Sequence, residues 1–281
     1  MGNIVWLAAY PKSGNTWLRA FLYNLIEQPA KPGRIASLPD YFESESDPRW
    51  YLPMLGGKPL EECSAEEIIS LKSAVHRQIA GSRPSGSVFT KTHNRFGSYN
   101  DHPLHNTSVM SGAIYIVRNP LDVVLSTADH FALTVDEAID FMSNEDTGTP
   151  SNMENVVSCL GSWSSHVESW TRQAHKQIIV IRYEDMLDKP LKAFGQVAKL
   201  LGLGKDKNGI KRAIRYSSFA ELKKQETGEG FIERSQNSKY FFRKGKKNQW
   251  IDGLTDAQAE KIIDRHRQQM QIHKYIPPRF L

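Results

Sequence analysis

The chain has 281 residues, of which 40% are hydrophobic and 24% are charged, an ordinary composition for a folded protein with one large domain or two small ones. Its net charge of +5 suits an anionic ligand or a nucleic acid, but many protein surfaces are equally basic, so the charge alone selects neither. The sequence shows no secretory signal pattern and no apolar window long enough to span a membrane. Its two cysteines, Cys63 and Cys159, have neither the spacing of metal ligands nor that of a disulfide scaffold. Together these observations favour a cytoplasmic protein with reduced thiols.

The first predicted element is a buried strand at Asn3–Ala9, a largely apolar run that ends before Pro11. Further strands are expected where short, β-branched apolar runs recur, at Ser87–His93, Gly112–Arg118 and Gln177–Arg182. The segment Pro29–Gly57 is rich in proline and glycine and is expected to be irregular.

Helices are expected between these strands. Two S/T-x-x-E/Q capping boxes mark helix starts at Ser64 and Thr255, and Asn119 followed by Pro120 marks a third. The predicted helices are Thr16–Glu27, Ser64 to about Ala80, Pro120–Phe131, Gly161 to about Ala174, Tyr183 to about Leu201, Lys205–Tyr216, Ser218–Gln225 and Thr255–Tyr275.

The alternation of strands and helices predicts an α/β fold, with a central parallel sheet flanked by helices on both faces and one domain over residues 1–281. In such sheets, ligands bind beyond the carboxyl ends of the strands. The residues at the four predicted strand ends are Lys12, His93, Arg118 and Tyr183.

The segment PKSGNTW, Pro11–Trp17, joins the first strand to the first helix. Gly14 permits a tight turn, and the following N–H groups open a helix whose N-terminus attracts negative charge. The nucleotide-loop pattern Gly-x-x-x-x-Gly-Lys-[Ser/Thr] is not met, because Lys12 precedes Gly14. Taken alone, the segment suits either an anion-binding loop or an ordinary turn with a solvated lysine.

Several segments, taken together and in order, carry a resemblance to a known family. They are YPKSGNTW at Tyr10–Trp17, TKTH at Thr90–His93, YIVRNPLDVVLS at Tyr115–Ser126, GSWSSHVESW at Gly161–Trp170, RYEDM at Arg182–Met186, SSF at Ser217–Phe219 and FRKGKKNQW at Phe242–Trp250. With these motifs the chain resembles the cytosolic-type sulfotransferases, which transfer a sulfuryl group from 3′-phosphoadenosine-5′-phosphosulfate (PAPS) and release 3′,5′-adenosine bisphosphate (PAP). The resemblance implies the P-loop-like sulfotransferase fold, with an acceptor-side excursion at about residues 30–85.

The resemblance also implies a role for each matching residue. The 5′-phosphosulfate would be held by Lys12, Ser13, Gly14, Asn15 and Thr16. The adenosine would be contacted by Trp17, Tyr183, Ser217 and Phe219. The 3′-phosphate would be bound by Arg118, Ser126, Arg243, Lys244 and Gly245. Arginine suits a phosphate because its planar guanidinium donates two parallel hydrogen bonds.

The implied reaction is in-line attack by an acceptor oxygen, which depends mostly on positioning and electrostatic stabilisation. His93 is the candidate general base, Lys12 would stabilise the leaving-group charge, and Lys91 would assist or orient the donor. No metal is expected, because lysines and helix N–H groups neutralise the sulfonate. His166 lies within a predicted helix and is interpreted as structural.

The chain departs from the family pattern within two of these motifs, and the short dimer motif that the animal enzymes carry after the corresponding Trp is not evident after Trp250. Asn94 and Arg95 follow His93 where the family often has Leu-Pro, and Asn248 and Gln249 precede Trp250 where it usually has Gly-Asp. Two alternatives stay open: a P-loop kinase, which requires Mg²⁺, and a nucleotide- or nucleic-acid-binding module without catalysis. The expected partner is a small apolar alcohol or phenol, with an amine, a sugar or a larger natural product as alternatives, and no nucleic acid or membrane span is expected. The sequence does not define the acceptor or the oligomeric state.

Overall fold

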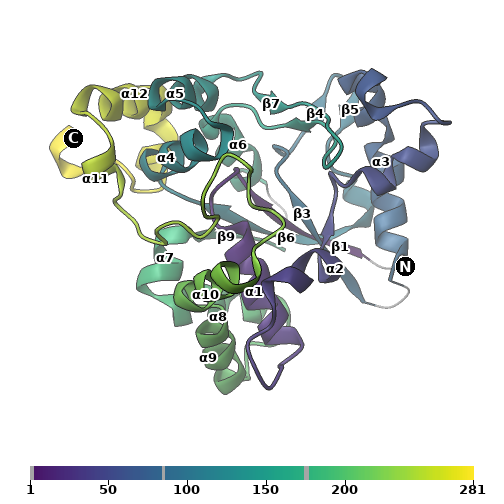
Figure 1. Ribbon diagram of the computed structural model, residues 1–281, viewed down its shortest axis with the longest axis horizontal. Coiled ribbons are helices and arrows are strands. Elements are labelled where there is room, and N and C mark those ends of the chain that lie inside the picture. The colour runs from purple at the N-terminus through teal and green to yellow at the C-terminus, as the bar shows by residue number, and fades with distance from the viewer. Residues whose placement is uncertain (1–2, 84–85, 174–176) are drawn as a thin grey trace. The chain divides into compact units, whose positions relative to one another are not determined.

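The computed structural model describes residues 3–83, 86–173 and 177–281. Its centre is a five-stranded parallel sheet in the order β2-β3-β1-β6-β9 (Figure 1). The strands are β1 (Asn3–Ala9), β2 (Glu43–Ser44), β3 (Ser87–Thr92), β6 (Met110–Val117) and β9 (Ile178–Arg182). All of β1 except Asn3 is buried, as expected for a parallel strand covered on both faces. The predicted α/β fold is therefore confirmed.

The chain divides into two compact units whose segments alternate along the sequence. The first unit comprises Met1–Tyr10, Phe42–Tyr115 and Met142–Ile178, and the second comprises Pro11–Tyr41, Ile116–Phe141 and Ile179–Leu281.

The first unit contains β1 to β3 and most of β6. Helix α3 (Ala65–Gly81) packs on β1 and β3, and it begins at the predicted capping box of Ser64 and Glu67. Helix α6 spans Trp163–Thr171. Two short antiparallel pairs complete the unit, β4 (Ser98–Tyr99) with β5 (His102–Pro103) and β7 (Gly148–Thr149) with β8 (Ser158–Cys159).

The second unit is mostly helical. Helices α8 and α9 gather beside α1, as Figure 1 shows. Its helices are α1 (Asn15–Ile26), α2 (Leu38–Tyr41), α4 (Pro120–Phe131), α7 (Tyr183–Asp188), α8 (Pro190–Leu200), α9 (Lys207–Tyr216), α10 (Phe219–Glu229), α11 (Trp250–Gly253) and α12 (Asp256–Ile272). Helix α5 (Val135–Ser143) crosses into the first unit, and 3-10 turns occur at Ile35–Ser37, Pro48–Trp50, Leu52–Met54, Leu60–Glu62, Thr107–Val109 and Pro278–Phe280.

The structure corrects four element predictions. The helix predicted after β9 is two helices, because Lys189 leaves the helical region (φ −137°) and Pro190 starts a new first turn. Helix α6 starts at Trp163, after its N-cap Ser162, and its predicted end at Ala174 lies outside the described residues. The segment Pro29–Gly57 contains β2, which adds an edge strand to β3, and helix α5 was not predicted at all. Within the described ranges, no helix combines the length and apolarity that crossing a bilayer requires.

Candidate active site

The loop after β1 turns sharply before α1. Lys12 and Gly14 both have positive φ, 66° and 109° respectively, and Gly14 is the residue that precedes the helix. No side chain caps α1 at this position, and its first backbone bond runs from the Leu18 N–H to the Gly14 carbonyl at 3.1 Å. The helix N-terminus therefore presents its positive end without a competing side-chain acceptor at the cap.

Three strand ends contribute residues that contact one another within the second unit. Arg118, directly after β6, donates to the Lys12 carbonyl oxygen at 2.8 Å, and its guanidinium lies 4.4 Å from the ring centroid of Tyr183. Tyr183 follows β9 and closes on the loop, since a Cβ added at Gly14 would be 2.8 Å from the Tyr183 ring. Gly14 is thus required both by its φ angle and by this close approach.

Three buried polar atoms in this cluster have no hydrogen-bond partner among the residues that the structure describes. They are the hydroxyl of Ser13, whose residue is 1% exposed, Nε of Arg118 and Nε1 of Trp17. A buried donor left unsatisfied costs about 1–3 kcal/mol, more when it is charged. An anionic ligand at this loop supplies the missing acceptors, so the residues present fit a phosphate or phosphosulfate group.

The predicted adenosine residues include an aromatic group around Trp17. Its ring is half-buried and lies edge-on to Tyr183 (5.6 Å between centroids) and to Phe194 (5.7 Å). Phe219 begins α10 and remains partly exposed. Ser217 is fully buried, and its hydroxyl donates to the Ala213 carbonyl at 2.8 Å, so that hydroxyl serves the end of α9.

The predicted 3′-phosphate residues lie on α4 and on the late basic loop. Ser126 is half-buried on α4, and Arg243 reaches the same helix, where it donates to the Leu125 carbonyl at 3.2 Å and pairs with Asp129 at 3.3 Å. Lys244 is exposed. Gly245 has a φ of 57°, and an added Cβ would be 2.1 Å from the Phe219 ring. This contact joins the basic loop to the residue predicted to face the adenine.

The basic loop is tied to the start of α4 by a carboxylate that the sequence analysis missed. Asp122 accepts the Asn248 N–H at 2.8 Å and the Trp250 N–H at 3.1 Å. The backbone of Asn248 is in the left-handed region, with a φ of 60°. Glycine is the usual residue in this region, and asparagine tolerates it better than most other residues. Asparagine at this position is therefore compatible with the left-handed turn that the loop makes here.

Two more acidic residues of the second unit organise the cluster and were also missed. Glu226 accepts the backbone N–H groups of Phe241 and Phe242, at 2.5 and 2.9 Å, and the Phe241 ring lies 4.3 Å from Nζ of Lys12. Glu233 contacts the first turns of α1, where it accepts from Arg19 at 2.5 Å and from Thr16 at 3.2 Å.

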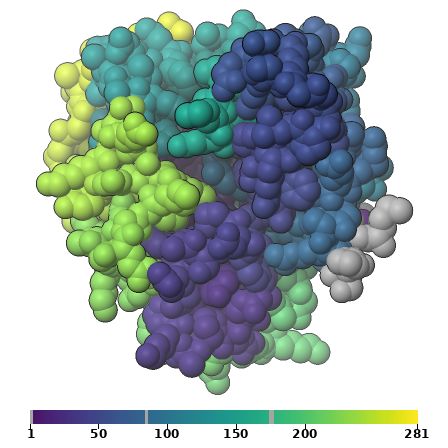
Figure 2. All heavy atoms as spheres, turned by 45° about the vertical axis from the view of Figure 1, so that its right-hand side comes forward, coloured from purple at the N-terminus to yellow at the C-terminus, as the bar shows by residue number. Residues whose placement is uncertain are grey.

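In Figure 2 the yellow-green segment after α10 borders the purple N-terminal surface, in agreement with these contacts. Because more than 200 residues separate Glu233 from α1 in the sequence, no local pattern indicated the pairing.

The candidate base belongs to the first unit. Residue Ala8 of β1 pairs with Thr92 of β3, so Ala9 and His93 follow at the same level of the sheet. Nδ1 of His93 lies 2.7 Å from the Ala9 carbonyl oxygen. Because a carbonyl only accepts, Nδ1 carries a proton, and in the neutral ring the lone pair is then on Nε2. This is the tautomer that a general base acting through Nε2 requires.

His166 holds the backbone of His93 through a hydrogen bond. Its Nε2 donates to the His93 carbonyl at 3.0 Å, and its Nδ1 accepts from the Tyr115 hydroxyl at 2.9 Å. Burial lowers the pKa of His166 to about 3, so the ring is neutral. These contacts agree with the structural interpretation of His166. Lys91 is half-buried in β3, opposite Leu7 of β1.

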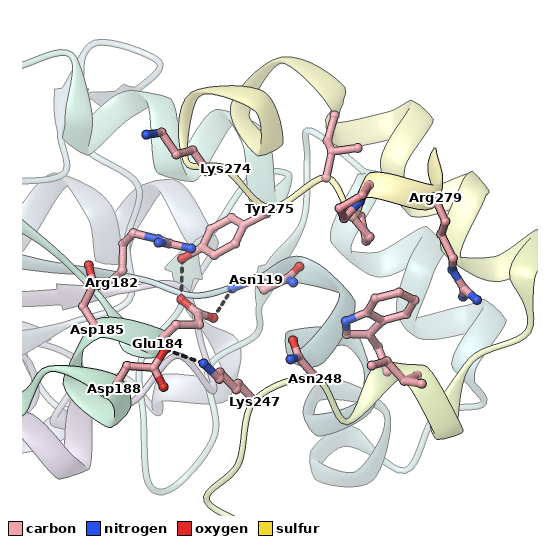
Figure 3. A pocket seen from close by; sticks show the side chains of 15 residues that line it. Asn119, Arg182, Glu184, Asp185, Asp188, Lys247, Asn248, Lys274, Tyr275 and Arg279 are labelled. Atoms are coloured by element: carbon pink, nitrogen blue, oxygen red, sulfur yellow. Dashed lines mark hydrogen bonds and ion pairs between the residues drawn. The ribbon is translucent and has the colours of Figure 1, made fainter. Parts of the chain in front are cut away.

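The second unit also contains a cavity of about 600 Å³, which is lined by other residues than the predicted site (Figure 3). Its wall is organised by Glu184, which accepts from the Tyr275 hydroxyl at 2.7 Å and the Asn119 N–H at 3.0 Å. Lys247 and Asp188 form an ion pair at its edge. None of the predicted site residues lines this cavity. In the described ranges, no cluster of three or more His, Cys, Asp or Glu side chains has the arrangement of a metal site.

Comparison with known proteins identifies the family. A family model described as "Sulfotransferase domain" matches residues 3–274. Flavonol 3-sulfotransferase of Flaveria bidentis is 24% identical over 272 residues, covering 92% of this chain and 79% of that protein. Cytosolic sulfotransferase 13 of Arabidopsis thaliana is 26% identical over 272 residues, covering 91% and 73%.

Solved structures share the fold. Mouse sulfotransferase SULT7A1 complexed with PAP superposes with a TM-score of 0.60 at 21% identity, covering 95% of this chain and 84% of that one. Retinol dehydratase in complex with androsterone and PAP gives a TM-score of 0.63 at 16% identity, covering 98% and 83%.

Proposed function

The chain belongs to the sulfotransferase domain family, a family of enzymes, and on that premise we propose that it transfers a sulfuryl group from PAPS to a small-molecule acceptor. The acceptor group is a hydroxyl, with an alcohol or phenol as the default, or an amine. One observation carries the proposal: among the described residues, the hydroxyl of Ser13 and Nε of Arg118 are buried without a hydrogen-bond partner, in the loop that leads into the uncapped α1 and in the arginine that contacts this loop.

Within this proposal each part of the donor has a defined place. The loop from Lys12 to Thr16 takes the 5′-phosphosulfate. The adenine lies among Trp17, Tyr183 and Phe219, and Ser217 supports them through the end of α9. The 3′-phosphate is taken by Arg118, Ser126, Arg243, Lys244 and Gly245. The relatives solved with PAP support this assignment of the donor.

His93 acts as the general base in the proposed reaction. Its Nε2 takes the proton of the acceptor hydroxyl as the acceptor oxygen attacks sulfur, and the bond from sulfur to the bridging oxygen of PAPS breaks. Lys12 stabilises the charge that develops on that bridging oxygen, and Lys91 orients the donor. The reaction as proposed needs no metal ion, since the lysines and the helix N–H groups supply the positive charge.

The proposal extends to the whole chain. Residues 1–281 are proposed as one sulfotransferase domain, because the family model runs through segments of both compact units. Residues of about 30–85 are the proposed acceptor-side excursion. Relatives named cytosolic sulfotransferases support a cytoplasmic location.

Calorimetric titration with PAP, 5′-AMP and ATP, each with and without Mg²⁺, tests the donor assignment. We expect tight binding of PAP that requires the 3′-phosphate and is independent of Mg²⁺. A preference for ATP with Mg²⁺ would instead favour a P-loop kinase. PAP binding combined with no sulfuryl transfer to any hydroxyl or amine acceptor would leave only a nucleotide-binding module.

A further inference from the structure

A buried carboxylate, that of Glu45, accepts hydrogen bonds from the residues on both sides of His93. Glu45 follows β2, where its N–H donates to the Lys91 carbonyl at 3.2 Å, and its side chain is 1% exposed. Its Oε1 accepts hydrogen bonds from the Thr92 hydroxyl and the Asn94 amide. One oxygen atom therefore holds the residue before His93 and the residue after it.

The other oxygen of Glu45 faces helix α3. Oε2 accepts from Nε2 of His76 at 3.1 Å and lies 3.6 Å from Nζ of Lys72, and both of those side chains are fully buried. Nδ1 of His76 accepts the Asn106 N–H at 3.2 Å, which fixes the ring as the tautomer that donates to Glu45. The carboxylate thus links α3 to the end of β3.

The charges of this cluster follow from its contacts. Burial alone would raise the pKa of Glu45, but the Lys72 ammonium and the His76 hydrogen bond lower it below its ordinary value. Glu45 in turn raises the pKa of Lys72 in spite of burial, whereas burial lowers the pKa of His76 and brings that of His105 to about 3. At neutral pH the cluster is one ion pair with two neutral histidines.

The same short segment is held from other elements as well. The Asn94 carbonyl accepts from Nε1 of Trp170 at 3.0 Å, and the Asn94 side-chain oxygen accepts the Cys159 N–H at 2.7 Å. Fixing this backbone fixes the direction from which the His93 ring reaches Ala9. Stability alone does not explain the cluster, because apolar residues often replace a buried ion pair with no loss of stability.

We propose that Glu45 is a positioning residue for sulfuryl transfer, which holds Thr92 and Asn94 so that the His93 ring keeps its hydrogen bond to Ala9 and directs Nε2 at the acceptor. This rests on the proposed role of His93. Glu45 contacts neither substrate nor donor in the proposal and acts only through its two neighbours on the strand end. Asn94, one of its partners, stands where the family often has leucine.

The test is Glu45→Gln, which keeps the shape but places an amide donor where the carboxylate accepts. We expect kcat/KM to fall on the order of 10²-fold, because small displacements of a catalytic group have effects of that size. The limb of the pH profile that reports the base is expected to shift, while PAP affinity stays that of the wild type. Asn24→Ala is the control, since Asn24 is buried and accepts the Gly33 N–H, and both residues belong to the second unit whereas the Glu45 cluster belongs to the first. It is expected to lose stability and keep its turnover and pH profile.

A second variant covers the case in which Glu45→Gln does not fold. Thr92→Val preserves the Glu45–Lys72 ion pair and removes the hydrogen bond from the Thr92 hydroxyl to Glu45. We expect a smaller loss of kcat than in Glu45→Gln, with the same shift in the pH profile. Wild-type kcat/KM and pH profile in Thr92→Val, or in folded Glu45→Gln, would overturn the inference. Turnover by His93→Asn at the wild-type rate would instead overturn the role of His93 in the proposed function, so the two failures are distinguishable.

Discussion

Nδ1 of His93 lies 2.7 Å from the carbonyl oxygen of Ala9, the last residue of β1. Nδ1 therefore anchors the ring to β1, while Nε2 is the atom proposed to act as the base. In His93→Asn, the side-chain amide still donates from a position near Nδ1 but offers no base. We expect turnover to fall by about 10²–10⁴-fold, the usual contribution of a general base, with PAP binding retained in calorimetry.

His102→Asn is the matched control, because His102 lies in β5 with a partly exposed side chain. It is expected to turn over at the wild-type rate. Equal rates for His93→Asn and the wild type would exclude His93 as the base.

Gly245→Ala should weaken nucleotide binding more than it weakens folding. The left-handed backbone costs about 1 kcal/mol for alanine, and the new Cβ would lie 2.1 Å from the Phe219 ring and must displace it. We expect PAP affinity to fall about tenfold, equivalent to 1.4 kcal/mol, in calorimetric titration. Gly202→Ala provides the comparison, since Gly202 also has positive φ (75°) but nothing within 4 Å of an added Cβ. If both variants bind PAP equally well, the contact with Phe219 has no role in binding.

Glu233→Gln should tighten donor binding. Glu233 places a negative charge at the first turns of α1, 2.5 Å from Arg19, where it opposes an incoming anion. The amide keeps the hydrogen-bond acceptor and removes the charge, so PAP affinity is expected to rise about threefold at low salt and less at high salt. Glu229→Gln makes the same change in net charge at an exposed pair with Arg34 and should leave the affinity unchanged. Weaker binding by Glu233→Gln would show that its contact with Arg19 is needed to shape the loop.

The buried histidines predict a loss of stability in mild acid. Burial lowers the pKa of both His166 and His105 to about 3, whereas in the unfolded chain they titrate near 6.5. Below pH 6.5 the unfolded state binds more protons, so the free energy of unfolding falls by up to about 1.4 kcal/mol per pH unit for each histidine until pH approaches 3. Urea unfolding between pH 7.5 and 5 measures this slope. In His166→Gln the unfolded state should take up one proton fewer, so the slope of the free energy of unfolding against pH should be smaller. An unchanged slope in that variant would contradict the assignment.

Local signals were sufficient for the turn after β1 and for several of the helix starts. Pro11 and Gly14 marked the turn after β1, and Asn119 with Pro120 marked the start of α4, where the Asn119 side chain does cap the helix. The break at Lys189–Pro190 was also signalled locally, by a proline inside the predicted helix, but the helical pattern on both sides concealed it.

Contacts between distant segments had no local signal. Arg118 reaches the Lys12 carbonyl across 106 residues, and Glu45 reaches Asn94 across 49. The sequence identified Arg118 through its motif, whereas Glu45 lies in a segment that read as irregular. Edge strand β2, which places Glu45, is only two residues long and therefore has no alternating pattern to detect.

The alternation of the two compact units along the chain has an evolutionary consequence. The residues proposed to hold the donor and those that carry His93 and Glu45 are interleaved, so no single genetic crossover exchanges one set while leaving the other intact. Exchange of the segment that carries His93 and Glu45 therefore requires two crossovers, one on each side of Phe42–Tyr115. Point substitutions and loop-length changes within Phe42–Tyr115 need no crossover, and they are constrained only by the register of β3 on β1.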